Sequence, residues 1–529
     1  MKRKIFAVIA ALILLSNSGA VMAENQVSPD LSWPLPAAEG EIGFTTVDQI
    51  LGQNYGYSRL FVWDGSKEIP CINATDSFCS TFPWKYGIQL KQVFPLCSQA
   101  PASQDCIVGV EVSDGKVSKP AQFIRNLPYP RFDANPDLNI PLGGQPSLWS
   151  NPFSNDPTTG LLVSASGDMR KELPDIATAP YSMRSFTAGI VSYQEKNGDY
   201  QPITVIPPVP TNTFSSFDTT QVPVECAWSD KGLCGVSTAF PGIKTITLKL
   251  RLQNNLTGWL AGRLDEPTIS VTKFSDTQNI LSVTGKPSVV AQVSAHTLAA
   301  SATQEMKDLS VQNLGDEYAS FRIDKLVPFL NAYKAITKDT ATKLIPTWSF
   351  NDGFGPSTNN CLKSSNEFVG LVTTNATALQ FEPPSFENGS LNYVIAAPHF
   401  QPTGQPYEGT YSLNIKSTAA RCLYNFTNAP ISATVTVLNE GGDTAITTSA
   451  LTESDGWLKL NISGIHFSNP TIRIQLKQEV VAPTPSASAT PTPTTVAGKK
   501  LLSITCVKGK LTKIVKALHP TCPKGYKKK

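Results

Sequence analysis

The residues whose type and spacing most clearly indicate a binding function are ten lysines at the end of the chain. They lie within Lys499–Lys529, a segment that contains two cysteines and no acidic residue. Grouped ammonium charges attract anionic surfaces, by roughly 1 kcal/mol per lysine near an anionic membrane and by less at high salt. The residues predicted to bind an anionic surface are Lys499, Lys500, Lys508, Lys510, Lys513, Lys516, Lys524, Lys527, Lys528 and Lys529. The plainer alternative is that a lysine-rich end only keeps the protein dissolved.

The expected partners of these lysines are anionic wall polymers or lipid head groups. Without the three basic residues of the leader and the ten tail lysines, 31 of the 44 basic residues remain against 41 acidic ones. The rest of the chain is therefore acidic, and only its end suits an anionic partner. Nucleic acid is not expected, because the end has one aromatic residue, Tyr526, and exported proteins rarely meet DNA. For the body, a carbohydrate or a protein is the expected ligand.

Residues for catalysis form no recognisable pattern. There is no G-x-S-x-G motif, and the four histidines are scattered: His296, His399, His466 and His519. His399 is the first candidate for a triad assembled in space, with a structural or exposed role as the alternative. Glu382 and Glu387 would serve glycoside hydrolysis only at a fixed separation in a cleft, which nothing in their spacing indicates. We therefore expect no catalytic residue and no cofactor.

The ten cysteines predict disulfides rather than a metal site. Zinc sites favour spacings such as C-x₂₋₄-C, and neither H-E-x-x-H nor an EF-hand motif is present. Neighbour pairing is the simplest scheme, with roughly 2–3 kcal/mol of stabilisation for each short loop and about 4 for the longest. The expected pairs are Cys71/Cys79, Cys97/Cys106, Cys226/Cys234, Cys361/Cys422 and Cys506/Cys522.

The eight tryptophans, Trp63, Trp84, Trp149 and Trp259 among them, could offer stacking faces for sugars. Packing in the core is the alternative role for each of these side chains.

The first 23 residues predict a signal peptide. Lys2, Arg3 and Lys4 precede the eleven apolar residues of Ile5–Leu15, and small or aliphatic residues lead to a cleavage site after Ala23. Eleven apolar residues are too few to span a bilayer, and no later apolar run approaches the roughly 18 residues that a membrane span needs. We expect a secreted protein, extracellular or wall-associated, without a transmembrane segment. Ten cysteines agree with an oxidising compartment.

Short alternating segments predict strands through most of the chain. In Thr245–Leu252, isoleucine and leucine alternate with threonine, lysine and arginine, which is typical of a half-buried antiparallel strand. Phe321–Ile336 instead has apolar residues at helical spacing, interrupted by Pro328.

These patterns predict a mainly β protein with several antiparallel β-sandwich-like domains and one short helical segment. A Pro/Thr-rich linker and a small, disulfide-closed, basic β-hairpin are expected at the C-terminus. The predicted order is a signal peptide (1–23), an extended segment (24–41), a disulfide-stapled β-domain (42–128), a second β-domain (129–320), a helical connector (321–345), a β-sandwich (346–480), a linker (481–498) and a Lys-rich hairpin (499–529).

Two stretches resemble parts of uncharacterised secreted actinobacterial proteins. Ile504–Lys529 contains I-T-C, K-G-K and C-P-x-G-Y-K-K-K, which resembles a C-terminal module of that group. Ala420–Leu423, with Pro430–Val437, Gly456-Trp457 and Phe467–Ile474, is similar to their last large domain. The tail has Lys-Ile-Val where Lys-Lys-Val is common. The resemblance implies location and architecture, and no activity.

The sequence therefore favours an envelope-associated protein without enzymatic activity. Its role would be structural, adhesive or ligand-binding, and its basic end would hold it on anionic wall polymers. The alternative is a secreted carbohydrate-active or other hydrolytic enzyme with an unrecognised active site. A third hypothesis, a lectin-like module, requires several tryptophan faces on one exposed sheet.

Overall fold

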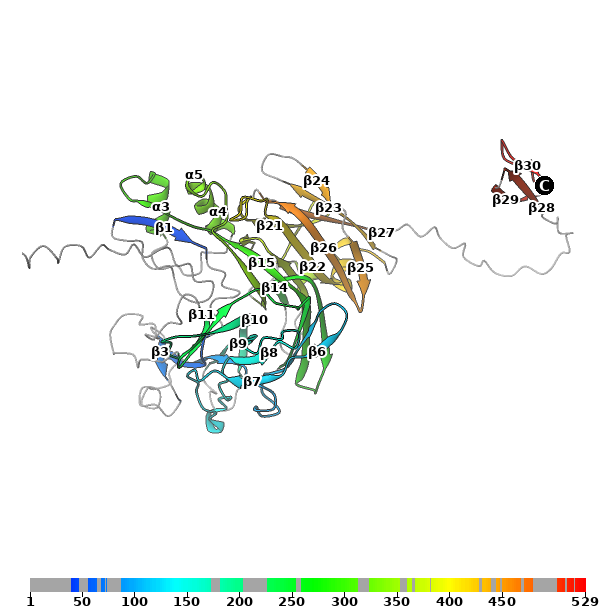
Figure 1. Cartoon of the computed structure of the whole chain (residues 1–529). Helices are drawn as coiled ribbons and strands as arrows, with labels where there is room; N and C mark the ends of the chain where they lie inside the picture. Colours follow the sequence, from blue (N-terminus) through cyan, green and yellow to red (C-terminus); the bar gives the residue numbers. More distant parts are fainter. Residues whose placement is uncertain are drawn as a thin grey trace, which may run out of the picture. The chain divides into compact units, whose positions relative to one another are not determined.

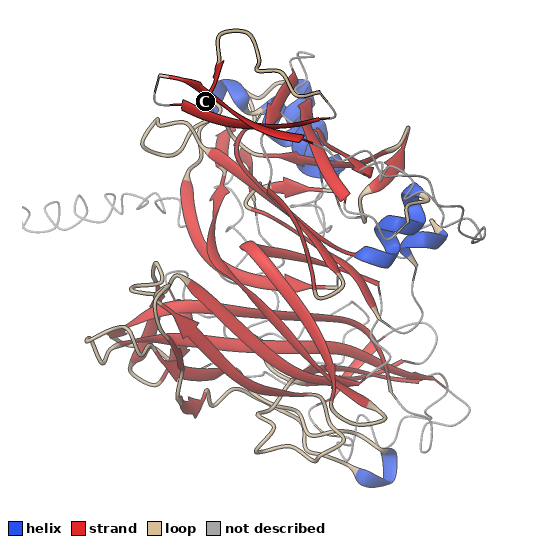
Figure 2. Cartoon of the chain, turned by 90° about the vertical axis from the view of Figure 1, so that its right-hand side faces the viewer, coloured by secondary structure: helices blue, strands red, loops and turns tan. Residues whose placement is uncertain are grey.

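The structure is a computed structural model, and it divides into two compact units, Met1–Glu479 and Val480–Lys529. It describes residues 40–46, 56–63, 68–71, 73, 87–172, 181–202, 226–253, 258–312, 323–352, 359–363, 367–380, 382–427, 431–438, 444–447, 450–467, 471–478, 502–509, 511–517 and 519–529. The predicted signal peptide and linker, Cys79, Lys499, Lys500 and Lys510 lie outside these residues. Strands dominate the first unit, as Figures 1 and 2 show. No helix among the described residues is long and apolar enough to cross a membrane.

One long ladder of hydrogen-bonded strands runs through the first unit, in the order β3-β2-β4-β9-β10-β17-β14-β18-β22-β26-β25. Its strands are β2 (Arg59–Trp63), β3 (Glu68–Cys71), β4 (Gly87–Val93), β9 (Thr159–Glu172), β10 (Ser182–Asn197), β14 (Gly258–Lys273), β17 (Lys343–Asn351), β18 (Phe368–Thr374), β22 (Glu408–Lys416), β25 (Ala450–Ser454) and β26 (Trp457–His466).

A second ladder has the order β6-β5-β13-β15-β14. Its further strands are β5 (Cys106–Ser113), β6 (Ser118–Pro120), β13 (Thr245–Gln253) and β15 (Gln278–Gln292). Short strands extend the first ladder beside β9 and β10, namely β7 (Phe123–Asn126), β8 (Ser147–Ser150), β11 (Cys226–Asp230) and β12 (Leu233–Ser237).

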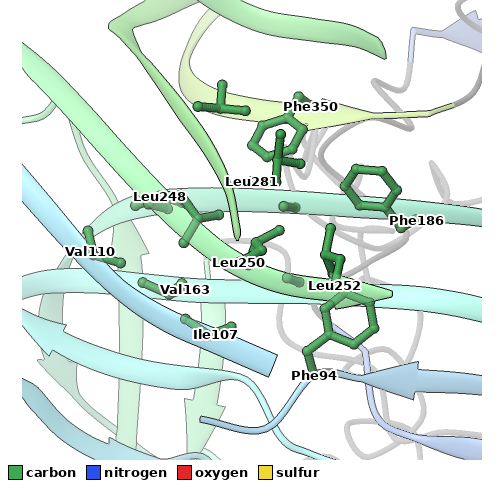
Figure 3. Packing of buried hydrophobic residues seen from close by; sticks show 14 of the residues in the cluster. Phe94, Ile107, Val110, Val163, Phe186, Leu248, Leu250, Leu252, Leu281 and Phe350 are labelled. Carbon is green, nitrogen blue, oxygen red and sulfur yellow. The ribbon is translucent and has the colours of Figure 1, made fainter. Parts of the chain in front are cut away.

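Strand β13 follows the alternation predicted for it. Ile246, Leu248 and Leu250 are fully buried and Leu252 nearly so, while the strand pairs antiparallel with both β5 and β15. Their side chains join a core that includes Val163, Phe186, Leu281 and Phe350, as Figure 3 shows. The one departure is Arg251, which is also buried.

Strand β14 belongs to both ladders because it changes sheets near its middle. Residues up to Arg263 pair with β17 and β18, and residues from Leu264 onward pair with β15. The register shifts between Asp265 and Thr268, and Glu266 has a left-handed backbone with φ 49°. An inserted residue that bends a strand is a common way to turn a sheet corner.

A separate sheet packs toward the β18-β22-β26 part of the first ladder. Its order is β19-β21-β27-β23-β24, with β20 beside β21, and both sheets contribute to one apolar cluster. The strands are β19 (Ala378–Leu379), β20 (Ser385–Glu387), β21 (Ser390–Ala396), β23 (Ile431–Leu438), β24 (Thr444–Thr447) and β27 (Thr471–Gln478). Helix α6 (Ser417–Tyr424) follows β22, and the Cys361–Cys422 disulfide joins it to the turn η3 (Asn360–Leu362).

The prediction of one helical segment is wrong. Besides α4 (Ile323–Ala332), which contains Pro328, and α5 (Lys334–Thr337), the chain forms α3 (Gln304–Gln312) and α6. Helices α3 and α4 contribute to a small apolar cluster with β1 (Glu41–Thr45) and β16 (Ser294–Leu298), and these two strands pair with each other. A short 3-10 helix, η1, spans Pro136–Leu138. Helices of eight to ten residues carry too little periodic signal to stand out from surrounding strands.

The first two predicted β-domains share one core. Strand β4 pairs with β9, and β5 pairs with β13, so hydrogen bonds connect strands on both sides of residue 128. The apolar cluster correspondingly extends from Leu60 to Trp457. Local patterns identify strands but do not say which distant strand becomes a partner.

Four disulfides join described cysteines, and each matches neighbour pairing: Cys97–Cys106, Cys226–Cys234, Cys361–Cys422 and Cys506–Cys522. Cys71 is also disulfide-bonded.

A buried carboxyl group, Asp105, lies next to the Cys97–Cys106 disulfide. Asp105 is 1% exposed and accepts a hydrogen bond from the backbone N–H of Gln253 at 2.7 Å. Burial raises the pKa of Asp105 to about 7, although this hydrogen bond and the charge of Arg251 both oppose the rise. The folded protein therefore holds a proton on Asp105 at pH values where the unfolded chain has released it.

We expect Asp105→Asn to reduce the pH dependence of stability. The contribution of the Asp105 proton is fully present below the unfolded pKa of about 4 and is lost as pH rises to about 7, so wild type loses stability over this window. Urea unfolding at about pH 5 and about pH 8 should show a smaller difference for the variant. Part of the pH dependence of stability should remain in the variant, because burial also raises the pKa of Asp352 to about 7. Asp276→Asn, at an exposed site, is the control. If the difference in the free energy of unfolding between the two pH values is the same in Asp105→Asn as in wild type, Asp105 is not the source of the pH dependence.

Candidate functional site

The C-terminal unit contains a three-stranded sheet in the order β29-β28-β30. Its strands are β28 (Leu502–Lys508), β29 (Leu511–Ala517) and β30 (Lys527–Lys528), and Gly509 has a left-handed backbone with φ 59° between the first two. Cys506 is fully buried and bonds to Cys522, which closes the segment between β29 and β30 against the middle strand. The final residue is also fixed, because its backbone N–H donates to the carbonyl of Thr505 at 2.8 Å. We call residues 502–529 the basic module.

The strand register places lysines on both faces of the basic module. Lys513 and Lys528 lie directly opposite Cys506 on its two neighbouring strands, so all three side chains belong to one face. Lys527 lies opposite Val507 and belongs to the other face. The lysines for which this register is described therefore lie on both faces of the module, which suits a broad charged surface better than a shaped pocket.

The predicted lysines that the structure describes are exposed: Lys508, Lys513, Lys524, Lys527, Lys528 and Lys529. Lys516 lies in β29, opposite Ser503. Because residues 499–529 include no aspartate or glutamate, the module cannot neutralise these charges internally. Three aliphatic side chains are exposed beside them, Leu502, Leu511 and Ile514, each by more than half.

His399 contacts a carboxylate, that of Asp339. Its Nδ1 contacts Oδ2 of Asp339, which also lies 3.0 Å from Nζ of Lys334, and its backbone N–H donates to Asp339 Oδ1 at 3.2 Å. This is the acid–histidine half of a triad. Among the described residues, no hydroxyl or thiol donates to the other ring nitrogen.

The other candidate residues do not converge on a catalytic centre. His296 Nε2 lies 3.4 Å from the hydroxyl of Ser294. His466 lies opposite Glu408 at the end of a strand pair, and His519 is exposed. Glu382 and Glu387 are both exposed. No group of three His, Cys, Asp or Glu side chains among the described residues could hold a metal ion.

The tryptophans are part of the core where they are described. Trp149 and Trp259 are at most 5% exposed, and their indole N–H groups donate to Ser147 and to the carbonyl of Leu362. Trp228, Trp348 and Trp457 are equally buried. The Trp84 residue and the Trp63 side chain lie outside the described residues. The tryptophan side chains that the structure describes are therefore buried and do not form an exposed row on which a sugar could stack.

Sequence reasoning found His399 and the lysines but missed Asp339 and the surface depression near it. Asp339 has a left-handed backbone with φ 56°, and its chain neighbours gave no motif. The depression is formed by residues between Val289 and Glu408, more than a hundred positions apart, so no local spacing could indicate it.

Comparisons with known proteins do not narrow the function. No protein-family model, curated protein or solved structure matches this chain. The chemistry of the described residues is therefore what supports a function.

Proposed function

We propose that this is a secreted, envelope-associated protein without enzymatic activity that its basic module holds on anionic wall polymers. The body would then act as a structural, adhesive or ligand-binding part at the surface. Export is supported by the n-region and apolar segment of residues 1–23 and by the disulfides, which are typical of oxidising compartments.

The observation that carries the proposal is the exposure of six lysines on a small module that has no acidic residue. Each exposed ammonium group contributes roughly 1 kcal/mol near an anionic surface, so a few engaged lysines give useful retention. The Cys506–Cys522 bond supports the same interpretation, because about 30 residues bury too little apolar surface for an independent fold without a crosslink.

Removal of the module tests the proposal. The full chain and a chain that ends at Gly498 are compared for retention on purified cell-wall fragments at about 0.05 M and about 0.5 M salt. We expect the full chain to bind at low salt and to be released at high salt, and the shortened chain to stay in solution in both. Equal retention of the two chains, insensitive to salt, would contradict the proposal.

A further inference from the structure

An open groove of about 500 Å³ lies between strands β15 and β17 and the loop that precedes β22. Its floor includes Val289 of β15 and Leu344 of β17, and Val289 is 40% exposed. On the other side, the groove is lined by Gln401 and by Gln405–Glu408. These residues belong to the loop that runs from Phe400, which forms a bridge with Pro406, to the start of β22. We call this site the 400–408 groove.

This loop is held in place before any ligand arrives. The backbone N–H of Phe400 donates to the carbonyl of Asp339 at 3.0 Å, and the N–H of Ala341 donates to the carbonyl of Phe400 at 2.8 Å. Across the loop itself, Gln401 N–H donates to the carbonyl of Gln405 at 2.8 Å. A site whose backbone is already ordered avoids much of the entropy cost of binding.

An added peptide strand does not fit this groove. The hydroxyl of Tyr407 lies 2.8 Å from the carbonyl of Val289 and accepts from the N–H of Ala291 at 3.1 Å. The hydroxyl of Thr377 donates to the carbonyl of Ala291 at 2.7 Å. Because these side chains already satisfy the backbone groups at this edge of β15, a ligand has to be recognised by side chains instead.

The available side chains suit hydroxyl groups. Within the described part of the chain, the exposed Gln405 amide and the exposed Glu408 carboxylate have no hydrogen-bond or ion-pair partner, and no lysine or arginine lines the groove. An amide both donates and accepts, and a carboxylate accepts, which matches a hydroxyl that can do both. An anionic ligand would instead meet an unpaired carboxylate.

An exposed aromatic side chain, Phe400, lies on the same loop, opposite the lining residue Pro406. Phe400 is 40% exposed and forms an antiparallel bridge with Pro406, a lining residue, so the two side chains belong to one face of the loop. A flat ring beside an amide and a carboxylate provides an apolar contact for the C–H face of a pyranose and hydrogen bonds for its edge.

We propose that the 400–408 groove binds a neutral glycan chain, with Phe400 against a sugar face and with Gln405 and Glu408 on its hydroxyls. This site would prefer an uncharged ligand, whereas the basic module would prefer an anionic one. The body would contact neutral polysaccharide while the module contacts an anionic polymer.

The test uses the full-length oxidised protein and soluble hexasaccharides, in salt high enough to suppress the basic module. Cellohexaose, maltohexaose and chitohexaose are titrated calorimetrically, with hexagalacturonate as the anionic comparison. We expect at least one neutral hexasaccharide to bind with a dissociation constant below ~1 mM and hexagalacturonate to bind more weakly. No binding of any neutral hexasaccharide overturns the proposal.

Two variants locate the site on the groove. Phe400→Ala and Gln405→Ala are each expected to weaken the binding about tenfold, since each removes one contact. Phe274→Ala is the matched control, because Phe274 is an exposed phenylalanine, 54% exposed, that does not line the groove. Unchanged binding in both groove variants, or equal weakening in the control, overturns the assignment. The chain ending at Gly498 should bind the hexasaccharide normally, which separates this site from retention by the module.

Discussion

Replacement of the six exposed lysines of the basic module by glutamine is expected to weaken retention on wall fragments by ~100-fold or more. The side chains are Lys508, Lys513, Lys524, Lys527, Lys528 and Lys529. If three of them contact the surface at once, roughly 3 kcal/mol is lost, and 1.4 kcal/mol corresponds to a factor of ten. Apparent dissociation constants from sedimentation with increasing amounts of wall fragments measure the effect.

The fold of the module should survive this change, because the lysines are exposed and the Cys506–Cys522 bond remains. Arginine at the same six positions is the matched control. It keeps the charge, and we expect it to retain binding and its sensitivity to salt. Sedimentation with phosphatidylglycerol vesicles separates lipid head groups from wall polymers as the preferred surface. Glutamine variants that bind as tightly as wild type would rule out the charge-based explanation.

Arg263→Leu is expected to destabilise the first unit by about 3 kcal/mol or more, because each buried carbonyl left without its donor costs about 1–3 kcal/mol. Arg263 is fully buried at the point where β14 leaves the first ladder. Its guanidinium donates to the carbonyls of Thr374 at 3.0 Å, Ala376 at 2.6 Å and Thr377 at 3.4 Å. Leucine leaves those carbonyls buried without their donor.

Urea unfolding of the oxidised protein measures this effect. Arg125→Leu is the control, because Arg125 is about one-third exposed and forms a surface ion pair with Asp230, which contributes about 0–1 kcal/mol. The stability of Arg263→Lys should be between those of wild type and Arg263→Leu, since an ammonium group cannot donate to three carbonyls in the planar geometry of a guanidinium. A loss below about 1 kcal/mol in Arg263→Leu would show that the segment reorganises to satisfy its own carbonyls.

Local sequence patterns predicted strand content well and strand partners poorly. The alternation in Thr245–Leu252 identifies β13 and its buried face, because burial on a pleated strand repeats every second residue. Nothing in that alternation indicates that β5 and β15 lie on its two sides. Helix α6 was missed because its eight residues give little more than two turns of periodic signal.

The candidate sites also differ in how far the sequence predicts them. The lysines and cysteines of the basic module are close together in sequence, so composition and spacing were enough to select them. The 400–408 groove combines residues from β15, β17 and the loop before β22, and it exists only after these segments fold together. Asp339 and His399 likewise meet across 60 positions of the chain.

The pairing of β1 with β16 has a consequence for the order of folding. Thr45 and Ser294, whose hydroxyls lie 2.8 Å apart, are separated by 249 positions. Strand β1 is therefore synthesised long before β16, the strand with which it pairs, and loop closure over that span is slow. Attachment of β1 should be a late step in maturation, and a protease present during that delay would cleave here before it attacked the interior.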